Sequence, residues 1–290
     1  MSKIKPFNIK PYKGLITFFD LETAQDLGDF WRAGYEQNIT PGQIILERQI
    51  ISAQWRTVGD KNVSVRTWTM PTAAELKRIK AFVKSIKSIP DYNQEAAFKL
   101  LASCCHTDKH VVEEIINVLK DSPLVIGQNS NSFDIPWLKG RSMFHRITPL
   151  KNLVTLDTLS ISRKNFNLNS HSLDYKSKFL FNDGKLPTRY DMWQKVMQGD
   201  VKTLDQLCNK YGRKDVVLLE KVFCEMLPWC ESLPVQISSL LDDIKLQCPL
   251  CGSTDLCKNG FRVKSKRRHQ RWYCRDCYND FHMGVIKQNG

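Results

Sequence analysis

The sequence predicts an α/β fold followed by a small metal-bound unit, and three observations support this. Segments rich in β-branched and large apolar residues cover 14–21, 48–56 and 62–69, as expected of strands. Beyond position 157, apolar residues recur at helical spacing up to about position 227. Two Cys-x-x-Cys pairs then stand in a C-terminal segment that has too few apolar residues to fold alone.

The predicted elements follow an order typical of a sheet covered by helices. The first three strands would form an antiparallel meander, and residues 72–75 form a capping box for a helix that reaches about position 87. The next expected elements are helices at 94–105 and 108–120, a strand at 123–127, a helix from 135, and a strand at 153–157. Pro228 and Pro234 would end the last helix. We therefore expect domains over 1–229 and 247–290, joined by a linker over 230–246.

Two carboxylates close the first predicted strand. Asp20 and Glu22 follow a run of large apolar residues, and side chains two apart on a strand share a face. The two charges would repel each other unless a cation neutralised them, and hard oxygen ligands suit Mg²⁺ or Mn²⁺. The alternative is a strand end with one solvated acid and one helix cap.

A further acid precedes the helix that starts near position 135. The strand before it ends in a polar turn that carries Asn129 and Asp134, and Pro136 follows. Asp134 is therefore a helix N-cap, a metal-facing carboxylate, or both.

The third acidic segment has helical spacing. Apolar residues from Val216 to Phe223 form one stripe, and Tyr211 and Asp215 lie four positions apart on one face. A phenol one turn from a carboxylate is well placed to hold a water beside a metal bound there. Packing of Tyr211 on its own helix is the alternative.

Together the three segments resemble the DnaQ-like or DEDD superfamily of 3′–5′ exonucleases, which has an RNase H-like fold. The resemblance covers residues from about 12 to 229 and is of the tyrosine type, as in the proofreading domains of family-B DNA polymerases. Phage-encoded RNase H-like exonucleases are similar also over Asp157 to Leu159 and Leu173 to Tyr175. The resemblance implies a mixed sheet flanked by helices. Gln128 departs from the Gly-His-Asn that is common in the second motif, which leaves the local hydrogen bonding open.

The resemblance also implies hydrolysis of phosphodiesters by a two-metal mechanism, with two Mg²⁺ or Mn²⁺ ions. Asp20 would bridge the ions, and Glu22 and Asp215 would bind the one that carries the attacking water. Asp134 would act on the other ion, directly or through water. Tyr211 would orient the attacking water, since a free phenol has a pKa of about 10.

Three features have less specific interpretations. Asn129 would help to place the second ion's ligands or the terminal nucleotide. Asp157, at a strand end, is interpreted as a helix cap rather than a metal ligand. The segment 24–47, with Trp31 and Tyr35 among its apolar residues, either shapes a substrate groove or is only a packed loop.

The Cys-x-x-Cys pairs predict one structural Zn²⁺. Their spacing of 22 residues suits a tetrahedral site, whose ligands would be Cys248, Cys251, Cys274 and Cys277. Disulfides are the less favoured alternative, because nothing in the sequence indicates secretion. Cys257 stands outside both pairs and is expected to be a strand or core residue.

The C-terminal segment resembles the zinc ribbons of some transposase-associated proteins and is strongly basic. Residues 245–290 hold ten Lys or Arg and three Asp, so +7 of the chain's net charge of +13 lies there. Basic residues neutralise phosphates and aromatic residues stack on bases. The residues predicted to contact nucleic acid are Lys264, Lys266, Arg267, Arg268, Arg271 and Trp272. A solvated charge run is the alternative.

The composition indicates which binding partners and which cellular compartment to expect. A sequence pI of about 9.3 suits a polyanionic partner, with DNA favoured over RNA, and a replication or recombination protein is a second candidate. No stretch is long and apolar enough to span a bilayer, and the first residues lack the apolar run of a signal peptide. We therefore expect a protein of the bacterial or phage-infected cytoplasm.

Three functions remain open from the sequence. The first is a 3′–5′ exonuclease that uses the ribbon to grip its substrate. The second is a structure-selective endonuclease on the same fold, since a metal site alone does not dictate attack at a chain end. The third is a catalytically silent DNA-binding module.

Overall fold

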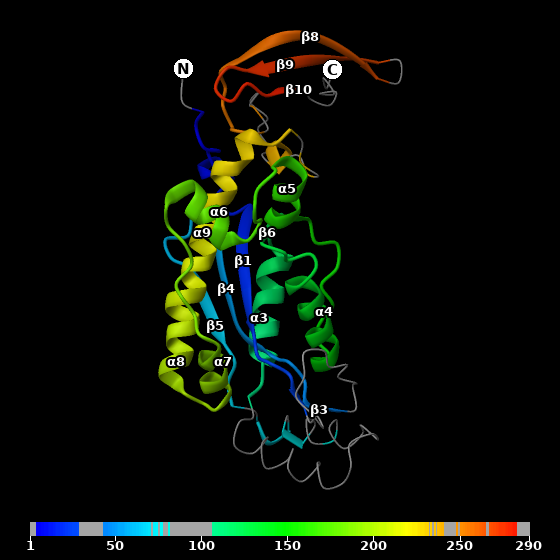
Figure 1. The fold of residues 1–290 in the computed structure, drawn as a ribbon. Coiled ribbons are helices and arrows are strands. Elements are labelled where there is room, and N and C mark those ends of the chain that lie inside the picture. Colours follow the sequence, from blue (N-terminus) through cyan, green and yellow to red (C-terminus); the bar gives the residue numbers. More distant parts are fainter. Residues whose placement is uncertain are drawn as a thin grey trace.

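The computed structural model describes residues 4–28, 43–70, 106–231, 250–264 and 267–282, with a few positions between 72 and 81 and between 233 and 248. In this part of the chain, helices flank a five-stranded mixed sheet of order β5-β4-β1-β6-β7, which confirms an α/β fold (Figure 1). β4 is antiparallel to both neighbours, as the predicted meander requires, whereas β1, β6 and β7 are mutually parallel. The strands are β1 (Ile16–Thr23), β4 (Ile50–Thr57), β5 (Ser64–Thr67), β6 (Leu124–Gly127) and β7 (Thr155–Asp157), with a separate pair β2 (Leu27–Gly28) and β3 (Ile44–Leu46).

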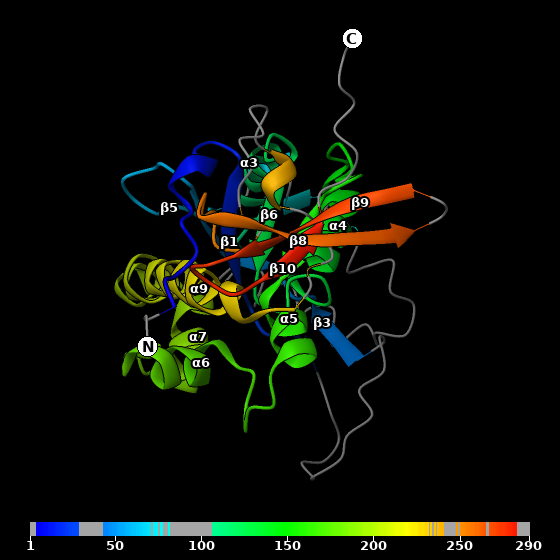
Figure 2. The same ribbon diagram turned by 90° about the horizontal axis from the view of Figure 1, so that it is seen from above.

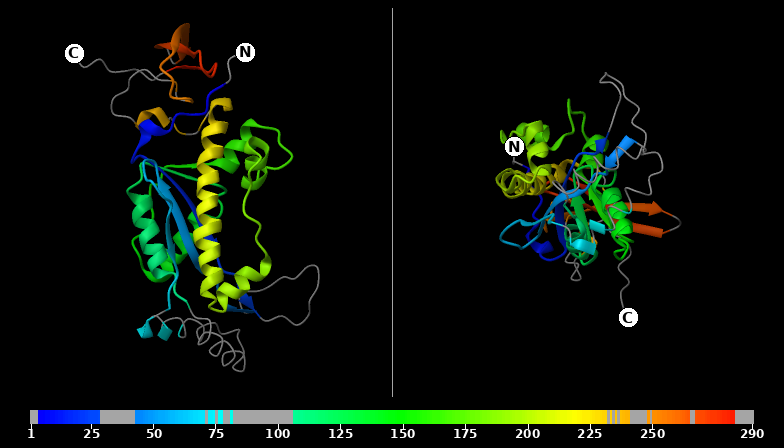
Figure 3. Two further views of the ribbon diagram at one scale, coloured as in Figure 1. Left: turned by 90° about the vertical axis from the view of Figure 1, so that its left-hand side faces the viewer. Right: turned by 90° about the horizontal axis from the view of Figure 1, so that it is seen from below.

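Helices cover both faces of this sheet. α9 runs along one face, and α3 and α4 cover the other (Figure 3). The helices are α3 (Lys109–Lys120), α4 (Asp134–His145), α5 (Thr158–Asn165), α6 (Leu173–Phe181), α7 (Tyr190–Met197), α8 (Val201–Asp205) and α9 (Arg213–Met226), with a π-helix η3 (Gln206–Gly212) before α9 and short 3-10 turns η1 (Lys10–Tyr12), η4 (Leu227–Trp229) and η5 (Ile237–Leu240). None of the described helices has the length and apolar character that a membrane span requires.

The alternation of side chains along β1 decides where its acids lie. Phe18 belongs to the core under α9, and its ring meets that of Phe223 edge-on at 5.6 Å. Phe19 belongs instead to the core under α3. Asp20 and Glu22 therefore share the α9 face with Phe18. Because β1 continues to Thr23, Glu22 is a strand residue, and the alternative of a helix cap at this point is wrong.

A second, three-stranded sheet lies at one end of the molecule, beyond the C-terminal end of α9. It consists of β8 (Leu256–Lys264), β9 (Arg267–Cys274) and β10 (Asp280–His282), and the long β8–β9 hairpin extends across that end when seen from above (Figure 2).

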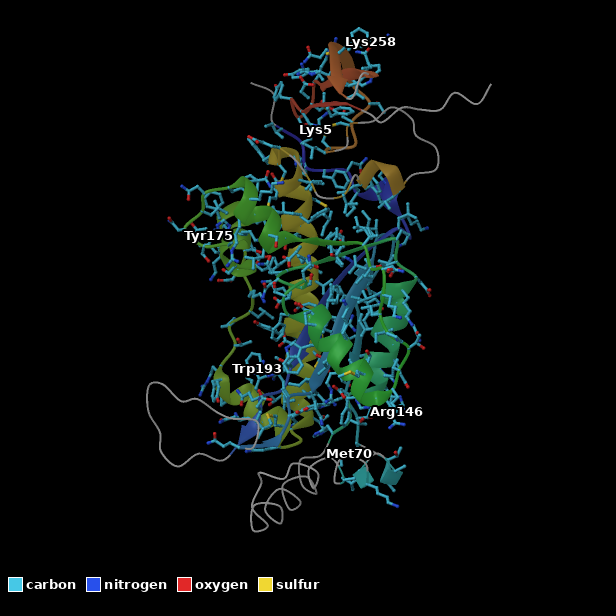
Figure 4. The ribbon with its side chains drawn as sticks, turned by 90° about the vertical axis from the view of Figure 1, so that its right-hand side faces the viewer. Lys5, Met70, Arg146, Tyr175, Trp193 and Lys258 are labelled. Carbon is cyan, nitrogen blue, oxygen red and sulfur yellow. The ribbon has the colours of Figure 1, made fainter. Side chains whose placement is uncertain are left out.

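The N-terminal segment joins this sheet to α9. The amide of Phe7 donates to the carbonyl of Cys224 at 2.8 Å, and the amide of Asn8 donates to the carbonyl of Cys251 at 3.3 Å. Lys5, which lies beneath the hairpin in Figure 4, pairs with Asp276 at 3.7 Å. One hydrophobic core thus contains residues of α9, of the N-terminal segment and of the cysteine pairs.

Several predictions concern residues outside the described part. The helices expected over 72–87 and 94–105, most of the segment 24–47 with Trp31 and Tyr35, and Lys266 lie largely or wholly there. The division into domains at 230–246 remains a prediction.

Candidate active site

Three carboxylates from distant parts of the chain converge on the α9 face of the sheet. Asp20 and Glu22 come from β1, and Asp215 comes from the first turn of α9. One oxygen of each lies within 4.8 Å of the others. Asp215 is fully buried, and its Oδ1 has no hydrogen-bond partner among the described residues.

A π-helix sets the start of α9. The chain forms η3 through Gly212 and becomes α-helical at Arg213, so the predicted continuous α-helix through Tyr211 and Asp215 is wrong. A Cβ atom at position 212 would lie 2.5 Å from Cδ of Gln54, so any larger residue here would require the Gln54 side chain on β4 to move. Gln54 is the register partner of Asp20, so this close packing brings the first turn of α9 over the acids of β1.

Burial raises the pKa values of these three acids, and repulsion from neighbouring carboxylates adds to the increase for Glu22 and Asp215. Burial is the main cause for all three, and it raises the pKa of Asp215 to about 7, with the charge of Asp20 adding to the effect. Glu22 has a pKa well above its usual value because it is buried near both Asp20 and Asp215. Each of these groups is therefore costly to ionise without a nearby positive charge.

A lysine supplies positive charge to the cluster. Lys185, in the connection between α6 and α7, donates a 2.6 Å hydrogen bond from Nζ to Oδ2 of Asp215. Burial acts to lower the pKa of Lys185, but Asp20 and Asp215 together raise it above its usual value. Sequence reasoning missed this residue, because it belongs to an aperiodic connection and only tertiary packing brings it to the acids.

Asp134 lies beside the cluster rather than in it. It is the first residue of α4, and Phe133 takes the N-cap position without a side-chain hydrogen bond, so Asp134 is not an N-cap. Its Oδ1 accepts a 3.2 Å hydrogen bond from the amide of Leu21, next to Asp20. Burial first, and then the charge of Asp20, raise its pKa well above the usual value.

Tyr211 lies near the cluster within η3. Nζ of Lys185 lies 5.5 Å from the centre of its ring, and the ring of Trp193 meets it edge-on at 6.5 Å. Burial raises the pKa of Tyr211, the charge of Lys185 opposes this, and the charge of Asp215 adds to it. The phenol is therefore a hydrogen-bonding group rather than a base.

The turn that follows β6 is fixed by Asp157. Its carboxylate caps α5 through the amide of Leu159, as predicted, and also accepts from the amides of Asn129 at 2.9 Å and Asn131 at 3.2 Å. Asn129 itself adopts a left-handed conformation with φ of 62°.

Gln128 makes three interactions that the sequence left open. Its Oε1 accepts from Lys176 at 2.8 Å and from Thr158 at 2.6 Å, and its Nε2 donates to the carbonyl of His171 at 3.1 Å.

The acid cluster fits a divalent cation. Three carboxylates with raised pKa values gather around one point, and one buried oxygen lacks a partner. Hard oxygen donors of this kind suit Mg²⁺ or Mn²⁺.

The four predicted zinc ligands also converge. Their sulfurs lie within 4.8 Å of one another, with Cys248 and Cys277 at 3.5 Å and Cys251 and Cys274 at 3.4 Å. All four are buried, and a thiolate set of this kind could bind zinc. Cys257 is outside the cluster, and its thiol donates to the carbonyl of Tyr273.

The β8–β9 hairpin carries the basic residues predicted to contact nucleic acid. In the backbone register of the two strands, Lys264 lies opposite Arg267, and Trp272 lies opposite Lys258. Arg271 forms an ion pair with Asp280 of β10.

No protein family matches this chain, and none of the curated proteins matches it either. Among solved structures, it is similar to the family B DNA polymerase from the hyperthermophilic archaeon Pyrobaculum calidifontis, with 14% sequence identity and a TM-score of 0.47. The similarity covers 73% of this chain and 24% of the polymerase chain.

Proposed function

We propose that this chain is a metal-dependent 3′–5′ exonuclease that hydrolyses phosphodiester bonds of nucleic acid, with DNA favoured. The observation that carries the proposal is the convergence of Asp20, Glu22 and Asp215, whose oxygens lie within 4.8 Å of one another. Gathering three repelling carboxylates, two of them buried, is costly, and bound cations would offset the part of this cost that Lys185 leaves. On this proposal the sheet and helices form an RNase H-like domain, and the cysteine unit is a zinc ribbon.

The four acids divide into two roles in this proposal. Asp20, Glu22 and Asp215 would hold the cations, and Asp134 would act on them from beside the cluster. Bound divalent cations supply Lewis-acid activation of the phosphate and a nucleophilic water. Asp134 is held for its role by the amide of Leu21.

Two neighbours complete the site. Tyr211 orients the attacking water through its hydroxyl, because a phenol with a raised pKa stays protonated and donates a hydrogen bond. Lys185 holds Asp215 through a 2.6 Å hydrogen bond and contributes positive charge where a phosphate would gain negative charge. Asn129 contacts the terminal nucleotide from the turn after β6.

The basic hairpin grips the nucleic acid in this proposal. The supporting observation is the charge of +7 carried by residues 245–290. Contacts to phosphates of this kind give affinity without sequence specificity and weaken as salt increases.

The test is degradation of a 5′-labelled single-stranded oligonucleotide with Mg²⁺ or Mn²⁺, comparing wild type with Asp215→Ala. We expect a ladder that shortens from the 3′ end and is absent in the variant and in chelator. Cleavage of circular single strands would indicate an endonuclease instead. No cleavage of any DNA or RNA by wild type would favour a binding module.

A further inference from the structure

A buried lysine lies close to the candidate site but makes no contact with its acids among the described residues. Lys176 of α6 is only 1% exposed. Burial lowers the pKa of Lys176 to about 8, and the negative charge of Asp157 opposes this. A buried ammonium is costly unless its donors are used, so its hydrogen bonds indicate what the residue does.

Those hydrogen bonds connect three elements. Nζ of Lys176 donates to Oε1 of Gln128 at 2.8 Å and to the carbonyl of Thr158 at 3.1 Å. The hydroxyl of Thr158 donates to the same Oε1 at 2.6 Å and to the carbonyl of Gly127 at 3.1 Å. The ammonium on α6 is thus linked to the end of β6 and the start of α5.

Gln128 begins the turn that leads into the acid of α4. The next residue, Asn129, is left-handed, and its amide is held by Asp157 at 2.9 Å. The carbonyl of Ser130 then accepts from the amide of Ile135 at 2.9 Å, next to Asp134. Turn residues 128–133 are therefore held on one side by Asp157 and on the other by Lys176 through Gln128.

We propose that Lys176 is a positioning residue, whose link to Gln128 fixes turn residues 128–133 and thereby sets Asn129 and Asp134 against the β1 acids. The inference rests on the proposed function, in which Asp134 acts on a cation and Asn129 contacts the terminal nucleotide. A lysine that only stabilised the fold would leave the acids' affinity for cations unchanged.

The test measures Mn²⁺ affinity on zinc-loaded protein, using the electron paramagnetic resonance signal of free Mn²⁺. The variants are Lys176→Met and Gln128→Leu, which break the link from its two ends. Lys120→Met, at an exposed position of α3, is the matched control for loss of one charge. Asp215→Ala identifies which Mn²⁺ binding belongs to the acid cluster.

We expect each of the two variants to weaken Mn²⁺ binding about tenfold, as is typical when a group behind a metal ligand is lost. At saturating Mn²⁺, kcat for oligonucleotide cleavage should fall about tenfold, because Asp134 is no longer held against the β1 acids. KM should rise as well, because Asn129 is no longer held where it contacts the terminal nucleotide. The double variant should have the same Mn²⁺ affinity and kcat as either single variant, because each single variant already breaks the link between Lys176 and Gln128. Lys120→Met should match wild type.

Unchanged Mn²⁺ affinity and kcat in folded variants would overturn the proposal, even if their melting temperatures fell. If Lys176→Met did not fold, Gln128→Leu would decide, because it removes the link and leaves Lys176 its Thr158 acceptor. If wild type bound Mn²⁺ at the acid cluster but cleaved nothing, the proposed function would fail, while the Mn²⁺ affinities would still support or overturn the positioning role. Absence of Mn²⁺ binding by wild type would overturn both.

Discussion

The ammonium of Lys185 and the carboxylate of Asp215 are joined by a 2.6 Å hydrogen bond in the middle of the acid cluster, although the residues are 30 positions apart. Among the described residues, the other oxygen of the fully buried Asp215 has no hydrogen-bond partner, and one Asp215 oxygen lies within 4.8 Å of oxygens of Asp20 and Glu22. Lys185 therefore offsets part of the negative charge of the acid cluster.

Replacing Lys185 with methionine should lower the rate of cleavage at saturating Mn²⁺ by about 100-fold, the typical loss for one group that stabilises developing charge. Single-turnover cleavage of a labelled oligonucleotide measures this rate. Lys202→Met, at an exposed position of α8, is the matched control and should cleave at the wild-type rate. A Lys185→Met variant with full activity would exclude a role for this charge in the reaction.

Replacing Glu22 with glutamine should stabilise the protein in chelator while abolishing cleavage. Burial, Asp20 and Asp215 all raise the pKa of Glu22, so its charge is unfavourable in the absence of a cation. Removing it should increase the free energy of unfolding by about 1 kcal/mol, or roughly 2–4 °C in melting temperature. Thermal unfolding in chelator measures the change in stability, and degradation of a labelled oligonucleotide with Mn²⁺ measures the loss of cleavage.

The exposed Glu47 provides a control, since Glu47→Gln should change neither stability nor activity. Lower stability of Glu22→Gln in chelator would mean that this carboxylate makes favourable contacts and that the cluster is not poised for a cation.

Sequence reasoning identified parts of the site that local patterns determine. The alternation along β1 predicted that Asp20 and Glu22 share a face, and the turn chemistry predicted that Asp157 caps α5. The π-helix before α9 was not predictable, because it depends on the packing of Gly212 against Gln54 of a different strand. Lys185 was missed for the same reason, since no periodicity marks a residue that reaches the site from an irregular connection.

Acid should destabilise the protein through a buried ion cluster outside the site. Burial acts to raise the pKa of Asp108, but hydrogen bonds from His145 at 2.6 Å and Arg141 at 2.7 Å outweigh it and lower the pKa to about 2. Because the folded-state pKa is below the usual value of 3.8, the stabilisation is present above about pH 4 and is lost as pH falls toward 2. The loss should be roughly 2 kcal/mol.

Urea unfolding between pH 6 and pH 2 checks this expectation, with Asp108→Asn as the comparison. The variant should be less stable by roughly 3–5 kcal/mol at neutral pH, because Arg141 would keep a buried charge without its carboxylate. It should also lose the part of the acid dependence that Asp108 causes. If Asp108→Asn lost as much stability as wild type between pH 6 and pH 2, the acid destabilisation would come from other carboxylates.

Removal of zinc should destabilise the whole protein rather than the C-terminal unit alone. The four cysteines share one hydrophobic core with Phe7, Tyr12 and the α9 residue Phe223. The amide of Asn8 also donates to the carbonyl of Cys251, so the N-terminal segment joins the cysteine cluster to α9. Cys251→Ser should therefore lose zinc. Its free energy of unfolding, measured from a single transition, should fall by on the order of 5 kcal/mol.

Zinc content and tryptophan-monitored thermal unfolding measure these effects, and re-addition of Zn²⁺ to chelator-treated wild type should restore the transition. Cys257→Ser is the matched control, because the thiol of Cys257 donates to a carbonyl and stands outside the cluster. A zinc-free protein whose main transition stays at the wild-type temperature, with only a separate early transition lost, would contradict the shared core and support an independent C-terminal domain. The predicted linker at 230–246 would then separate two units that fold on their own.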